Sequence, residues 1–145
     1  MSALLFRAAG VLIALALLAS QDGAFGQSLQ DLQLRKQRLV AALREDTVAP
    51  YEQWLSERPP RCDSPTLERA RRSALANAGI LRPETAGIDV VLAAGGWTLD
   101  IADGAKEHGC AIVARNLYDN VIKIYLGSAY TALRDRARIG IDDLR

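Results

Sequence analysis

Apolar residues recur three and four positions apart along most of this chain, and that spacing constrains the fold more than any other feature. An α-helix gathers residues with this spacing on one face and leaves the charged residues between them on the other. The pattern starts after Ser28, a good helix N-cap that is followed three positions later by Asp31. The first apolar positions are Leu29, Leu32, Leu39, Val40 and Leu43. The spacing therefore predicts an amphipathic helix from about residue 28.

Proline and glycine residues predict where the helices begin and end. Pro50 removes a backbone N–H, so we expect a break or kink near Thr47 and a second helical stretch after it. Ser64 and Pro65 predict the start of the next helix, because proline suits the first helical position. Gly79 is placed to end that helix.

The C-terminal third predicts two further helices. The apolar positions of the first are Cys110, Val113, Ala114, Leu117, Val121, Ile122 and Tyr125. We expect Gly127 to end it and Ser128 to cap the next helix. Apolar residues at 130, 133 and 137 continue the pattern, and the last helix is expected to end near Gly140.

Residues 83–109 allow two interpretations. Ile88, Val91 and Trp97 fit helical faces, whereas Gly95 and Gly96 form a two-glycine turn signal. In the second interpretation, residues 89–94 and 97–101 would pair as a β-hairpin. The neighbouring elements are all predicted to be helical, which favours a helix here as well. The fold class is therefore predicted to be all-α, as a small helical bundle or a short array of helical hairpins.

Residues 1–26 have the three parts of a secretory signal peptide. Arg7 precedes a run of twelve uncharged residues, 8–19, and the segment ends in Ala24-Phe25-Gly26. An uncleaved membrane anchor is the alternative, but a spanning helix needs about 20 apolar residues. We expect cleavage after Gly26, with residues 27–145 forming a single exported domain. Its location would be the periplasm in a bacterium with an outer membrane, and otherwise the extracellular space.

The predicted export bears on the chemistry of the two cysteines, Cys62 and Cys110. In an oxidising compartment, a lone pair of cysteines predicts a structural disulfide. The alternatives are a reactive thiol, or a metal site in which the two cysteines bind the ion with the help of His108. No further Cys or His is available to complete a zinc site, and the chain has no Cys-x-x-Cys sequence for redox chemistry.

Residues 97–137 resemble a tetratricopeptide-type helical hairpin followed by the first helix of a second unit. Gly109, Ala114 and Tyr118 have the offsets that this family uses at the start and along the face of its second helix. The sequence Leu126-Gly127-Ser128-Ala129-Tyr130 resembles the turn into a following unit, although the usual turn proline is absent. The resemblance implies binding of a protein or peptide, and it carries no catalytic residues.

The chain predicts no catalytic, cofactor-binding or metal-binding residues. Asp100, Asp103 and Glu107 would share one helix face, which suits a solvated surface better than a calcium site. His108 could act as a general base only for a nucleophile, and the chain lacks the Gly-x-Ser-x-Gly sequence that presents a nucleophilic serine. The formal net charge of +1 gives no electrostatic reason to expect nucleic acid as a partner.

These observations predict a small exported protein-binding or accessory module whose partner is another exported protein. No stable membrane span is expected once the signal is cleaved. Tyr118, Tyr125 and Tyr130 mark the hairpin that we expect to carry the interaction surface. The alternative is an exported enzyme or small-ligand carrier that uses the carboxylates of Asp100, Asp103 and Glu107.

Overall fold

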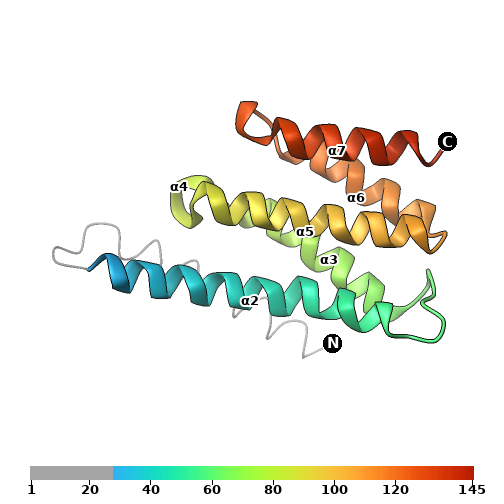
Figure 1. The fold of residues 1–145 in the computed structure, drawn as a ribbon, viewed down its shortest axis with the longest axis horizontal. Coiled ribbons are helices and arrows are strands. Elements are labelled where there is room, and N and C mark those ends of the chain that lie inside the picture. The colour runs from blue at the N-terminus through green and yellow to red at the C-terminus, as the bar shows by residue number, and fades with distance from the viewer. Residues whose placement is uncertain (1–27) are drawn as a thin grey trace.

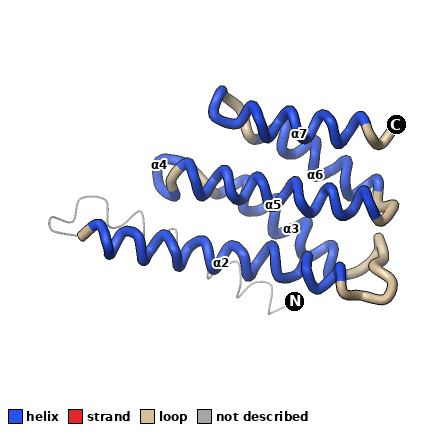
Figure 2. Tube along the Cα trace, viewed as in Figure 1, coloured by secondary structure: helices blue, strands red, loops and turns tan. Residues whose placement is uncertain are grey.

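A computed structural model describes residues 28–145 and contains only helices, turns and loops in that range (Figures 1 and 2). The elements in chain order are α2 (Leu29–Leu55), α3 (Pro65–Ile80), α4 (Pro83–Ala86), α5 (Ile88–Glu107), α6 (Ala111–Ile124), the 3₁₀ helix η1 (Ser128–Tyr130) and α7 (Thr131–Asp142). The all-α prediction is confirmed. The predicted signal peptide, residues 1–26, lies outside the described residues.

The helices alternate between two layers. Figure 1 shows α2, α5 and α7 running in the same direction across the molecule, with α3 and α6 returning behind them. Helix α3 packs on both α2 and α5, and α6 packs on both α5 and α7. Each returning helix is therefore held between two helices of the other layer.

Helix α2 continues unbroken through Pro50, so the predicted break near Thr47 is wrong. The buried stripe of α2 includes Leu43 and Thr47 before the proline and Trp54 after it. Because both halves of the helix bury this one stripe, tertiary packing offsets the cost of the missing N–H of Pro50. Local sequence carries no information about that packing.

Two polar side chains of α3 join it to α2 inside the bundle. The Asn77 amide donates a hydrogen bond to Thr47 Oγ1 over 2.9 Å, and the hydroxyls of Thr47 and Ser73 lie 2.7 Å apart. These hydrogen bonds satisfy the buried polar groups, which would otherwise weaken the core. They also fix the position of α2 along α3.

Helix α5 passes straight through Gly95 and Gly96, which excludes the hairpin interpretation and confirms the helical one. A Cβ at Gly95 would collide with the end of Leu133, whereas a Cβ at Gly96 would meet open space. The cost of glycine in a helix is therefore compensated by close packing at Gly95 but not at Gly96.

The predicted helix ends at Gly79, Gly127 and Gly140 each lie within three residues of the observed ends. Helix α3 runs past Gly79 to Ile80, and α7 runs past Gly140 to Asp142. Helix α6 ends at Ile124, three residues before Gly127, whose φ of 98° lies between α6 and η1. Ser128 is the first residue of η1 and caps no helix, because α7 begins at Thr131 after Tyr130, so that prediction is wrong. Gly140 is retained inside α7 because Tyr118 packs against its backbone, where a Cβ would collide with the ring.

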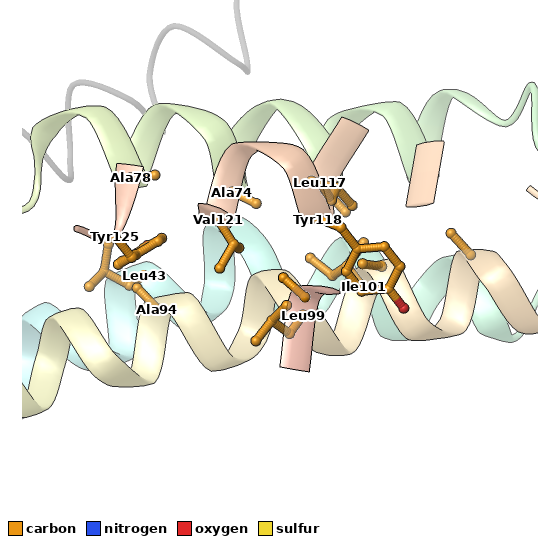
Figure 3. Close-up of a cluster of buried hydrophobic side chains, with 14 of the residues drawn as sticks. Leu43, Ala74, Ala78, Ala94, Leu99, Ile101, Leu117, Tyr118, Val121 and Tyr125 are labelled. Carbon is orange, nitrogen blue, oxygen red and sulfur yellow. The ribbon is translucent and has the colours of Figure 1, made fainter. Parts of the chain in front are cut away.

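The core lies between the two layers. Figure 3 shows Leu117, Tyr118 and Val121 of α6 near Leu99 and Ile101 of α5. All five side chains are almost fully buried. Ala74 of α3, Ala94 of α5 and Ala114 of α6 are also buried, and these small residues let the helix backbones approach closely.

Candidate functional site

The three tyrosines expected to mark the interaction surface contribute mainly to the core. Tyr118 is 0% exposed and Tyr125 is 3% exposed, while Tyr130 is half-buried with its ring packed edge-on against Tyr125. The rings of Tyr118 and Tyr125 therefore do not form an exposed surface, which corrects that prediction. Their helical spacing alone could not distinguish a buried face from an exposed one.

Tyr118 has a structural partner in α5. Its hydroxyl donates a hydrogen bond to Asp103. Burial and this hydrogen bond both raise the pKa of Tyr118 above its ordinary value. The ring thus reaches across the core and ends on a carboxylate at the surface, a common arrangement for a buried tyrosine.

The predicted row of carboxylates on α5 pairs with α7. Arg136 of α7 donates hydrogen bonds to Asp100 over 2.8 Å and to Asp103 over 2.7 Å, whereas Glu107 is exposed. Within residues 28–145, no group of three or more His, Cys, Asp or Glu side chains could hold a metal ion. The geometry therefore gives Asp100 and Asp103 a role in attaching α7, a role that sequence spacing did not reveal because Arg136 is distant in the chain.

The two cysteines meet at one end of the bundle. Cys62, in the α2–α3 loop, and Cys110, before α6, lie at disulfide distance with their Cα atoms 5.3 Å apart. His108 packs edge-on against Trp54 with ring centroids 5.3 Å apart, and the indole N–H of Trp54 donates to the carbonyl of Arg61 over 2.8 Å. We call this region, residues 54–62 and 108–110, the disulfide end.

Exposed apolar side chains concentrate at the opposite end. Of the nine large apolar residues that are exposed in the described part of the chain, seven belong to segments that begin or finish there (Figure 1). These seven residues define what we call the apolar end: Leu29, Leu32, Leu34, Ile80, Ile88, Ile124 and Leu126. The other two, Ile112 and Ile139, lie toward the disulfide end.

The N-terminal turns of α2 extend beyond the rest of the bundle at the apolar end (Figure 1). The stripe that buries Leu39 and Leu43 continues in the N-terminal direction with Leu32 and Leu29, which are 45% and 79% exposed. Lys36 forms an ion pair of 2.6 Å with Asp89 and so joins this part of α2 to the start of α5. The protruding helix therefore presents a continuation of a core-facing stripe with no helix packed on it among the described residues.

A cavity of about 440 Å³ opens at the same end of the molecule. Its walls come from the C-terminal ends of α3 and α6, from α4, from the start of α5 and from η1. Tyr125 is one of the lining residues, and its buried hydroxyl has no hydrogen-bond partner among residues 28–145. Burial raises the pKa of this hydroxyl to about 12.

No protein-family model matches this chain, and neither a curated protein nor a solved structure matches it. The fold and surface of the described residues are therefore the basis for assigning a class of protein. They define a small all-helical domain with an apolar end and a disulfide end. No helix within residues 28–145 is long and apolar enough to cross a membrane.

Proposed function

We propose that this protein is an exported protein-binding accessory module that docks through its apolar end. The observation that carries the proposal is the uneven distribution of exposed apolar side chains over the described surface. Isolated exposed apolar residues are ordinary, but a concentration of them is typical of interaction sites. Seven such residues at one end of a domain with only 118 described positions favour docking there.

The shape of the apolar end suits a helical partner. Leu29 and Leu32 extend the core-facing stripe of α2 beyond the bundle, with charged and amide side chains on either side. An apolar strip with a polar rim is the usual composition of a protein interface. A partner helix would bury this strip by the same packing that α3 provides further along α2.

Three further observations support the proposal. The tetratricopeptide-type resemblance over residues 97–137 implies protein or peptide binding, and in this proposal α5 and α6 form its hairpin. A cysteine pair at disulfide distance supports an oxidising, extracytoplasmic location for the domain and its partner. Of the three acidic side chains considered for an enzyme, Asp100 and Asp103 are paired with Arg136.

The test compares two exposed apolar positions at opposite ends of the molecule. Leu126 is 65% exposed at the apolar end, and Ile139 is 64% exposed toward the disulfide end. The protein is purified gently from its host, and native mass spectrometry records the companions that remain bound to wild type, Leu126→Glu and Ile139→Glu. We expect a stoichiometric companion with wild type and Ile139→Glu, and its affinity to fall roughly tenfold or more with Leu126→Glu.

Circular dichroism of both variants should show unchanged helix content and Tm, because each side chain is mostly in solvent. A companion that binds Leu126→Glu as tightly as wild type contradicts docking at the apolar end. Loss of the companion with Ile139→Glu alone would place the interface toward the disulfide end instead.

A further inference from the structure

The cavity at the apolar end has an apolar wall and a basic rim. Ala78, Leu81, Val91 and Ile124 provide aliphatic lining from three helices and the loop after α3. Arg82 and Lys123 line the same cavity, and no acidic side chain does. An apolar body with a negative charge at one end is the complement of such a lining.

The two cations are not neutralised within the described part of the chain. Arg82 donates to the carbonyl of its neighbour Leu81 over 3.0 Å and forms no ion pair, and Lys123 forms neither a hydrogen bond nor an ion pair there. The cavity thus combines an aliphatic wall with two positive charges that have no ion pair among residues 28–145.

We propose that this cavity binds a small amphipathic carboxylate, with its alkyl chain against the aliphatic wall and its carboxylate held by Arg82 and Lys123. A guanidinium can donate two parallel hydrogen bonds to a carboxylate, and an ammonium adds a point charge. A volume of about 440 Å³ is at the small end of ligand pockets, which matches a medium-length alkyl chain and not a large cofactor. The inference concerns the isolated chain and does not depend on the proposed protein partner.

The probe is decanoate, used below its micelle concentration and titrated into the purified protein by isothermal calorimetry. We expect saturable binding at one site per chain. Decylamine has the same alkyl chain with the opposite charge, and it should bind roughly tenfold more weakly or worse. Equal binding of the two probes would overturn the role of the basic rim.

Charge variants test the rim directly. Arg82→Gln/Lys123→Gln should weaken decanoate binding by roughly tenfold or more, because both charge-assisted contacts are lost. Arg58→Gln/Arg115→Gln is the matched control, since it removes two exposed positive charges that do not line the cavity. If the two double variants bind decanoate alike, long-range charge explains the binding and the proposed site is wrong.

A filling variant tests the cavity itself. Gly79 lines the cavity inside α3, and a Cβ there would meet open space, so Gly79→Leu should occupy the volume without disturbing the helix. Gly96→Leu is the control, because its Cβ also meets open space but Gly96 lies outside the cavity lining. We expect Gly79→Leu to abolish saturable decanoate binding and Gly96→Leu to retain it. Retention by both variants, with Tm at or above the wild-type value, overturns the proposal.

Discussion

At the residue scale, the tyrosines show how position in the fold gives one residue type different roles. Tyr118 is buried with its hydroxyl bonded to Asp103, whereas Tyr125 is buried with its hydroxyl unpartnered among the described residues. An unpartnered buried hydroxyl reduces the free energy of unfolding by about 1–3 kcal/mol. The Tyr125 hydroxyl is therefore a weak point of the folded chain.

Tyr125 should make the protein sensitive to alkaline pH. Burial raises its pKa from 10.0 to about 12, which means that the folded state favours the neutral phenol. The contribution of the neutral phenol to the free energy of unfolding is fully present below pH 10, which is the pKa in the unfolded chain. This contribution is lost as the pH rises from about 10 to about 12. At about 1.4 kcal/mol per pKa unit, this ionisation should lower the free energy of unfolding of wild type by about 3 kcal/mol. Tyr125→Phe should not show this decrease.

Urea unfolding of wild type and Tyr125→Phe at intervals from neutral to strongly alkaline pH measures this difference. At neutral pH, we expect Tyr125→Phe to unfold with a free energy equal to or above that of wild type, because the unpartnered hydroxyl is gone. Parallel pH profiles for the two proteins would contradict the assignment of the alkaline transition to Tyr125.

At the element scale, helices pack closely where glycine lets an aromatic ring approach the backbone. Tyr118 of α6 packs on Gly140 of α7, and Tyr51 of α2 packs on Gly104 of α5. Such contacts require the absence of a Cβ and explain why glycine is kept inside helices that it would otherwise weaken. The ion pairs from Arg136 to α5 act at the same crossing as Tyr118 and orient α7.

Gly140→Ala and Gly96→Ala should have opposite effects on stability. The Cβ added at Gly140 would collide with the buried Tyr118 ring, so we expect the free energy of unfolding to fall by about 1–3 kcal/mol. The Cβ added at Gly96 meets nothing within 4 Å, so the variant should gain about 0.5–1 kcal/mol from helix propensity. Urea unfolding of both variants gives the comparison, and destabilisation of the same size in both would argue against close packing at the α6–α7 crossing.

At the scale of the whole molecule, the two ends of the bundle differ in kind. The disulfide end ties the α2–α3 loop to the turn before α6. The apolar end carries most of the exposed large apolar residues and the cavity. A domain held firmly at one end can expose apolar side chains at the other without losing its fold, and both proposals place binding there.

The disulfide should contribute about 4 kcal/mol to the free energy of unfolding, from a sequence separation of 48 residues on the loop-entropy model. Cys62→Ala/Cys110→Ala should therefore unfold at markedly lower urea concentration than the oxidised wild type. Reductant should lower the midpoint of wild type toward that of the double variant and leave the variant unchanged. Intact mass spectrometry without reductant should find wild type lighter by two hydrogens than after reduction. If reductant leaves the urea midpoint of wild type unchanged, or if the intact mass is the same before and after reduction, the disulfide does not form.

The sequence by itself determined the helical class and the approximate extents of most helices. It also predicted the pairing of the cysteines, which lie at disulfide distance in the structure. Apolar spacing, the Ser28 and Ser64 caps and the positive φ of Gly127 are local features, and local sequence controls them directly. It also favoured the helix through Gly95 and Gly96, because both neighbouring segments were clearly helical.

Only the tertiary structure decided which faces meet and which remain exposed. The continuity of α2 through Pro50 depends on burial of its stripe on both sides of the proline, and Arg136 reaches Asp100 across 36 residues of sequence. The burial of Tyr118 and Tyr125, the apolar end and the cavity depend in the same way on contacts between helices that are distant in the chain. The period of the α-helix determines which side chains share a face, but the packing of a neighbouring helix determines whether that face is buried or exposed.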